Sequence, residues 1–147
     1  MYKRILIASD GTALSRRAEK AGIDLAAALS AEVVVLSVIP RLSRSLLDPT
    51  VVAAHVDQAE VDRLWSGFAA QTVAKVKDVA EKRGLAVRTV TVVSQNVAEA
   101  ILAAAKKYRC ELIVMASHGR RGLGSLLLGS ETQHVLVHGQ LPVLVIR

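Results

Sequence analysis

The chain has 147 residues, of which 52% are hydrophobic and 3% aromatic. The hydrophobic content excludes general disorder, and the length predicts a single domain over residues 1–147 with an adequate core. No apolar run approaches the roughly 18 residues that span a bilayer, and the run before Asp10 is too short for a secretory signal. We therefore expect a cytoplasmic protein without a membrane partner. The single cysteine, Cys110, excludes a disulfide framework and a cysteine metal cluster.

The formal net charge of +6 is compatible with nucleic-acid binding. However, the aromatic side chains that would stack on bases are nearly absent, and the Lys and Arg residues are spread along the chain. We therefore expect no nucleic-acid partner. The charge instead favours a general attraction to small anions, including nucleotides.

Buried strands and amphipathic helices alternate in the first half of the chain. Residues 3–9, KRILIAS, predict a strand buried on both faces, and residues 14–30 predict an amphipathic helix. Residues 32–39, EVVVLSVI, predict a second buried strand. After a longer connection, we expect a long helix from about Val52 to Arg83 that is ended by Gly84.

The second half continues the same alternation. Residues 86–94, AVRTVTVVS, predict a third strand, and residues 96–108 predict a third helix. Residues 111–117, ELIVMAS, predict a fourth strand. A glycine-rich loop leads into a fourth helix over residues 130–138, and residues 142–147 predict a last strand.

This order predicts an α/β fold in which a parallel sheet carries helices on both faces. Ligands of such sheets bind beyond the carboxyl ends of the strands, where the strand order reverses. Two of these ends are polar and flexible, namely "SDGT" after the first strand and "SHGRRG" after the fourth. If those two strands are neighbours, their loops face each other across one crevice.

The loop after the fourth strand allows two interpretations. Gly119 lets the backbone approach a ligand, Arg120 or Arg121 neutralises phosphates, and the helix that follows offers unpaired N–H groups. Alternatively, Ser130 and Gln133 form a capping box and bind no ligand. The absence of a lysine before Ser130 excludes the GxxxxGK[ST] phosphate loop.

The loop after the first strand is acidic. Asp10 would accept hydrogen bonds from a ribose hydroxyl or a base amino group, with phosphates on the opposite side of the crevice. Alternatively, Asp10 or Thr12 caps the first helix. No GxGxxG is present, so a dinucleotide-binding fold is not indicated.

Together, "ILIASDGT", "VVLSVI", "MASHGRRGLGSLLLGSETQHVL" and "LPVLVIR" resemble the single-domain type of universal stress protein from residue 2 to residue 147. The resemblance implies a doubly wound, three-layer fold with a five-stranded parallel sheet in the order 3-2-1-4-5. Many members bind ATP through a Gly, two residues, Gly, nine residues, Gly-Ser/Thr motif. Gly119, Gly129 and Ser130 match this motif, whereas Ala116 replaces its first glycine.

The resemblance also implies ATP as the ligand, with Mg²⁺ as the counter-ion. Adenosine would lie beside the first four of the implied site residues, which are Ala8, Asp10, Val38, Met115, Ala116, Gly119, Arg120, Gly129 and Ser130. At Ala116 a methyl group is added where the backbone passes close to the nucleotide. If this residue requires a left-handed conformation, alanine costs roughly 1–2 kcal/mol there.

Other candidates are weaker. His118 is interpreted as a loop residue because no partner lies at a readable spacing. His134 and His138 lie four apart on a helix, but without a third ligand a zinc site is disfavoured. Cys110 is expected to be a packed thiol, and Trp65 a core or interface residue.

We expect a regulatory protein of the stress response that binds an adenine nucleotide and acts as a homodimer. The alternatives are an interaction module of the same fold without a nucleotide site and, less favoured, a slow ATPase. The apolar stretch "LPVLVIR" predicts a strand at the edge of the sheet, where unpaired backbone groups attract a partner. We expect Val143 and Val145 to pair with the same strand of a second chain.

Overall fold

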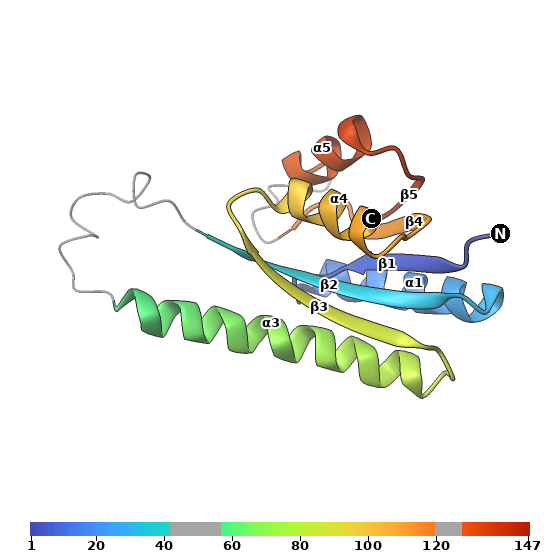
Figure 1. Ribbon diagram of the computed structural model, residues 1–147, viewed down its shortest axis with the longest axis horizontal. Helices are drawn as coiled ribbons and strands as arrows, with labels where there is room; N and C mark the ends of the chain where they lie inside the picture. Colours follow the sequence, from blue (N-terminus) through green and yellow to red (C-terminus); the bar gives the residue numbers. More distant parts are fainter. Residues whose placement is uncertain (42–56, 120–127) are drawn as a thin grey trace.

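The computed structural model describes residues 1–41, 57–119 and 128–147 (Figure 1). Its centre is a sheet of five parallel strands in the order β3-β2-β1-β4-β5, which confirms the expected fold class. The strands are β1 (Arg4–Ala8), β2 (Glu32–Pro40), β3 (Val87–Ser94), β4 (Leu112–Ala116) and β5 (Val143–Ile146). The helices are α1 (Ala13–Leu29), α3 (Gln58–Glu81), α4 (Val97–Lys107) and α5 (Ser130–His138).

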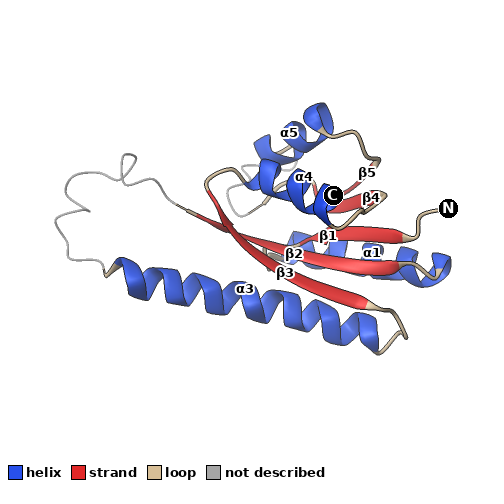
Figure 2. Cartoon of the chain, viewed as in Figure 1, coloured by secondary structure: helices blue, strands red, loops and turns tan. Residues whose placement is uncertain are grey.

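Helices cover both faces of the sheet (Figure 2). Because strand side chains alternate between faces, Ile5 and Ile7 of β1 pack with α1 and α3, whereas Leu6 packs with α4 and α5. Small side chains on the helices allow close packing, and a side chain on Gly22 of α1 would lie 2.7 Å from Cδ1 of Ile7. Within the described part of the chain, no helix is long and apolar enough to cross a membrane.

The strands and most helices agree with the predicted ranges to within one or two residues. The exception is α3, which begins at Gln58 because Oδ1 of Asp57 accepts a hydrogen bond from the N–H of Ala59. The expected start at Val52 was therefore wrong, and residues 52–56 lie outside the described residues. Gly84, which was predicted to end this helix, follows it with a φ of 77°. This left-handed conformation is typical of a glycine just after a helix end.

The topology places β1 between β2 and β4, since Leu6 aligns with both Val34 and Ile113. The expected adjacency of the first and fourth strands is thus confirmed. The strand order reverses at β1, where the first crossover leads to β2 and a later one leads to β4. The carboxyl ends of β1, β2 and β4 therefore meet at the position where parallel sheets bind ligands.

Candidate nucleotide site

A cavity of about 100 Å³ lies at the carboxyl ends of β1, β2 and β4. Six of the nine predicted site residues line it, namely Ala8, Asp10, Val38, Met115, Ala116 and Gly119. Gly129 and Ser130 do not line this cavity, but Glu131 and Thr132, the next two residues of the chain, do. Arg120 lies outside the described residues. The structure thus brings six of the nine predicted site residues together at one cavity.

Asp10 is held by the start of α1. Its Oδ1 accepts hydrogen bonds from the backbone N–H of Thr12 at 2.9 Å and from the Thr12 hydroxyl at 2.7 Å. Thr12 in turn caps α1, because its Oγ1 accepts from the N–H of Ser15. A side chain at Gly119 would lie 3.1 Å from Oδ2 of Asp10. Glycine at this position therefore allows the loop after β4 to approach the Asp10 carboxylate.

The walls of the cavity are apolar. Val38 of β2, Ile101 of α4 and Met115 of β4 all line it, and the sequence did not indicate Ile101 as a site residue. Ala116 lies in β4 and does not have a positive φ, so its backbone does not require glycine. The conformational cost considered for this alanine is therefore absent. Its carbonyl accepts a hydrogen bond from the buried hydroxyl of Thr132 at 3.0 Å, which connects β4 to α5.

The start of α5 has no side-chain cap. Gly129 is the N-cap residue, and no side chain accepts a hydrogen bond there. The alternative interpretation, a capping box formed by Ser130 and Gln133, was therefore wrong, because Gly129 is the N-cap and its backbone N–H donates to the Ser117 carbonyl at 2.8 Å. The side chain of Gln133 instead donates to the Leu128 carbonyl. The first N–H groups of α5 are thus not satisfied by a capping side chain, which is a feature that anion-binding helix starts share.

Gly129 is required for space. A side chain at this position would lie 3.1 Å from Cα of His118 and 3.3 Å from the Ser117 carbonyl oxygen. The φ of Gly129 is −62°, so the backbone conformation itself is open to other residues. Glycine therefore lets the start of α5 lie directly against the loop that follows β4.

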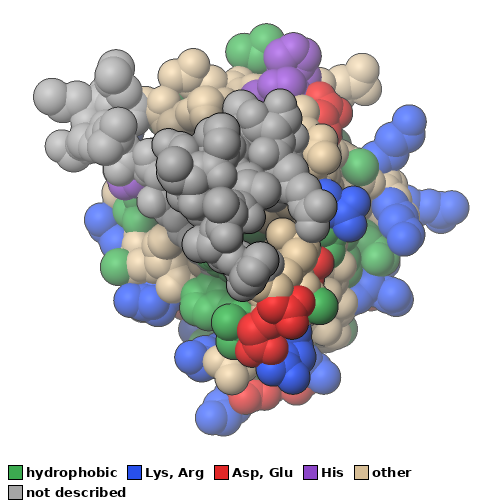
Figure 3. Space-filling model, turned by 90° about the vertical axis from the view of Figure 1, so that its left-hand side faces the viewer, with side chains coloured by type: hydrophobic (Ala, Val, Ile, Leu, Met, Phe, Trp, Pro, Cys, Tyr) green, Lys and Arg blue, Asp and Glu red, His purple; other side chains and the backbone are tan. Residues whose placement is uncertain are grey.

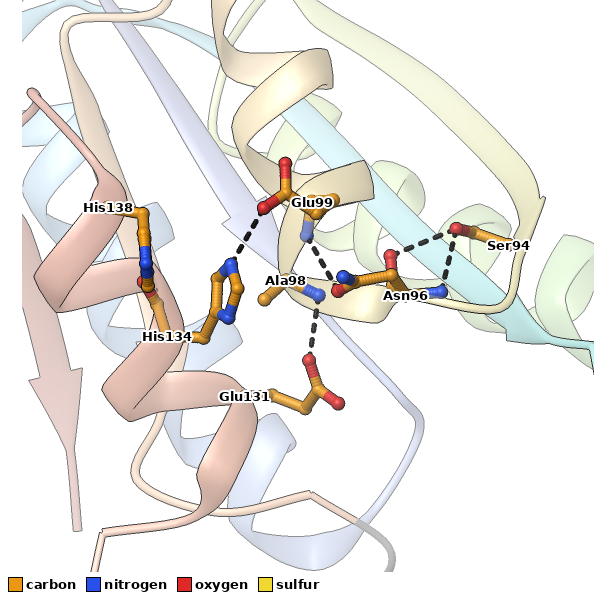
Figure 4. A network of polar contacts seen from close by, with 7 residues as sticks. All are labelled: Ser94, Asn96, Ala98, Glu99, Glu131, His134 and His138. Carbon is orange, nitrogen blue, oxygen red and sulfur yellow. Dashed lines mark hydrogen bonds and ion pairs between the residues drawn. The ribbon is translucent and has the colours of Figure 1, made fainter.

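Sequence reasoning missed Glu131, which connects α5 to α4 (Figure 4). Its Oε2 accepts a hydrogen bond from the N–H of Ala98 at 2.8 Å, in the first turn of α4. The next turn of α5 adds a hydrogen bond between Nε2 of His134 and Oε1 of Glu99 at 2.7 Å, with the His138 ring stacked on that of His134. The carboxylate of Glu131 thus lies at the start of α4, beside the cavity.

The described lining carries two carboxylates, Asp10 and Glu131, and contains no Lys or Arg. Beneath the Asp10 loop, the Ser9 hydroxyl donates to the carboxylate of Glu19, and burial raises the pKa of Glu19 above its ordinary value despite this hydrogen bond. Figure 3, which views the end where β2 and β3 finish, shows Lys and Arg side chains at the outer edge of this face of the molecule. The charged side chains of the described lining are thus acidic.

The remaining candidates lie at the cavity or away from it. His118 lines the cavity, and its Nδ1 lies 3.2 Å from the Ser117 hydroxyl. Among the described residues, no group of three His, Cys, Asp or Glu side chains is arranged to hold a metal ion, so His134 and His138 form no such site there. Cys110 is buried as expected, and burial raises the pKa of its thiol to about 11. The Trp65 ring packs edge-on against Phe68 of α3.

Comparison with known proteins agrees with this architecture. Universal stress protein MJ0531 of Methanocaldococcus jannaschii is 31% identical over 148 residues, covering all of this chain and 83% of the relative. The solved structure of the hypothetical protein MJ0577 superposes with a TM-score of 0.80 at 27% identity, over 99% of this chain and 96% of that one.

A universal stress protein solved in complex with cAMP superposes with a TM-score of 0.70 at 19% identity, over 99% of this chain and 97% of that one, which shows the shared fold. The family model described as "Universal stress protein family" matches residues 1–147. The whole matched length, the relatives and the observed strand order lead to one conclusion: the chain belongs to the universal stress protein family.

Proposed function

We propose that this protein binds an adenine nucleotide, ATP in the first instance, and acts as a regulatory protein of the stress response. The observation that carries the proposal is the start of α5, which lacks a side-chain cap and adjoins a cavity at the point where the strand order reverses. The cAMP complex of a fold neighbour supports the choice of an adenine nucleotide as ligand.

The site offers different chemistry to each part of a nucleotide. Val38, Ile101 and Met115 form an apolar surface suited to the adenine ring, and Asp10 accepts hydrogen bonds from the ribose hydroxyls. The cavity, at about 100 Å³, is small compared with the roughly 300–1,000 Å³ typical of ligand pockets. The phosphates would therefore lie outside it, along Gly129 and Ser130 at the start of α5, where the helix dipole favours negative charge.

The acidic lining makes a divalent cation appropriate. Phosphates placed near Asp10 and Glu131 would be repelled, and Mg²⁺ reduces this repulsion when it is bound to the phosphates. Mg²⁺ in proteins is commonly held by one or two carboxylates together with the phosphates of the substrate. Glu131, which directly follows Ser130, is the described residue that would provide such a carboxylate, because Asp10 is assigned to the ribose.

The decisive experiment is to purify the protein, denature it, and identify any released nucleotide by chromatography and absorbance. Titration calorimetry with adenosine, AMP and ATP, each with and without Mg²⁺, then separates the contributions of base and phosphates. We expect ATP with Mg²⁺ to bind more tightly than adenosine. If neither a released nucleotide nor a titration signal is found, the chain is an interaction module of the same fold.

We also propose that the protein forms a homodimer through β5. This strand is outermost in the sheet, next to β4 alone. On the inner side of β5, the Pro142 carbonyl accepts from the N–H of Ile113, and the Ile146 carbonyl accepts from the N–H of Ser117. Because the backbone groups of successive strand residues point to opposite edges, the N–H groups of Val143 and Val145 face the open edge. An antiparallel copy of β5 would satisfy them.

A further inference from the structure

A second and larger cavity lies at the opposite end of the sheet. Its volume is about 540 Å³, which falls within the range of small-molecule pockets, and it shares no lining residue with the candidate nucleotide site. It lies where β1, β2 and β3 start, on the right-hand side of Figure 1, and where α4 ends. Its polar side chains are those of Arg4, Glu32, Arg88, Lys107, Tyr108 and Arg109.

The cations of this cavity exceed its acids. Arg4 is neutralised by Glu32, whose Oε2 accepts from Nε of Arg4 at 2.7 Å. Arg88, Lys107 and Arg109 form no ion pair with any described carboxylate. Other described cations, among them Lys3, Arg17, Lys75 and Lys82, also form no ion pair with a described carboxylate. Arg88, Lys107 and Arg109 differ from these because all three line one concave part of the surface.

Two of the unpaired cations, Arg88 and Lys107, are positioned by one aromatic ring. The Tyr108 ring contacts both Arg88 of β3 and Lys107 of α4, each with its cationic group 5.5 Å from the ring centroid. The backbone of Tyr108 is itself fixed, because its carbonyl accepts a hydrogen bond from Nη1 of Arg4 at 2.7 Å. Two separate elements therefore present positive charge around one ring, and this pre-organisation reduces the entropy lost on binding.

Arg109 occupies a position that favours glycine. Its φ is 54°, in the left-handed region, at the turn between α4 and β4. The N–H of Cys110, the next residue, donates to the Ala105 carbonyl and completes the turn. An arginine there carries a conformational cost and places its side chain at the cavity.

From these observations we propose that the cavity is a second binding site, for a small polyanion that carries two or more phosphate groups. Guanidinium groups match the geometry of phosphate oxygens, and Lys107 adds a point charge. The end of α4 contributes partial negative charge, but Lys106 and Lys107 in its last turn compensate for it. Because this site is separate from the nucleotide site, the proposal does not depend on ATP binding there.

The test uses the full chain and inorganic tripolyphosphate as the probe. Titration calorimetry at low ionic strength measures affinity, and amide chemical shifts in NMR locate the bound anion. We expect shifts at residues 86–88 and 107–110, and an affinity that falls as salt is added. The double variant Arg88→Gln/Lys107→Gln should bind at least about tenfold more weakly, because hydrogen bonds to charged groups are the strong ones.

Two further variants sharpen the test. Lys106→Gln removes a neighbouring charge of α4 that does not line the cavity, and at physiological salt it should leave the affinity within about twofold, because a charge without direct contact to the anion is then largely screened. Arg109→Gly should weaken binding while making the protein more stable, because glycine accepts the left-handed conformation without strain. A folding defect therefore cannot imitate the expected result for this variant.

The proposal is overturned if tripolyphosphate does not bind, or if Lys106→Gln weakens binding as much as the double variant Arg88→Gln/Lys107→Gln does. It is also overturned if the shifts occur only at residues 129–131, which would place the anion at the nucleotide site. Adenosine, which has no phosphate, tests that other site alone, so each proposal can fail independently.

Discussion

At the scale of single residues, Gly129 is the most sensitive position of the candidate nucleotide site. We expect Gly129→Val to abolish ATP binding in titration calorimetry. The valine side chain would push the start of α5 away from Ser117 and His118. If one or two hydrogen bonds from helix N–H groups to the phosphates are lost as a result, the affinity for ATP should fall at least about tenfold. Circular dichroism should show that the variant remains folded. Unchanged affinity would place the phosphates elsewhere.

A second residue-scale prediction concerns Glu19. Burial raises its pKa in the folded state, so the folded protein holds this proton more tightly than the unfolded chain does. The associated stability is fully present below the unfolded pKa, near 4.5, and is lost as the pH rises through the raised folded value. The urea midpoint of Glu19→Gln relative to the natural protein should therefore increase with pH. A difference that stays constant with pH would contradict this account.

At the scale of elements, two glycines of the α3 region form a matched pair. A side chain added at Gly67 or at Gly84 would meet nothing within 4 Å, but only Gly84 has a positive φ, of 77°. We expect Gly67→Ala to stabilise the protein by about 0.5–1 kcal/mol through helix propensity. Gly84→Ala should destabilise it by roughly 1–2 kcal/mol through left-handed strain. Urea unfolding measures both, and equal signs would contradict the assignment.

Four strands were predictable because each contains a short apolar run, and β3 was predictable because it is rich in valine and threonine. The order of the strands followed from the family resemblance. Local signals failed at two helix starts. Asp57 caps α3, which therefore begins later than the apolar pattern suggests, and the N-cap of α5 is Gly129, whose N–H donates to the Ser117 carbonyl. The bond between Glu131 and Ala98 joins residues 33 positions apart on different helices. Pairing of this kind depends on packing and has no local signature in the sequence.

At the scale of the whole molecule, the open edge of β5 determines assembly. Proline at position 145 would remove an N–H that faces away from β4, so the monomer should still fold. We expect multi-angle light scattering to show a dimer for the natural protein and a shift toward monomer for Val145→Pro. A monomeric natural protein at micromolar concentration would contradict the proposed dimer.

The order of the strands also affects how the chain emerges during synthesis. Three adjacent strands, β1 to β3, and the two described helices of one face, α1 and α3, are complete by Ser94, whereas the described helices of the other face, α4 and α5, come later. Leu6, Val34 and Leu36, all buried in the finished protein, therefore lack their covering helices in the nascent chain until residues after 97 are made. Such exposed apolar surface favours aggregation and chaperone binding. The half-made protein is thus a two-layer sheet with one bare face, and slow translation through α4 would prolong that state.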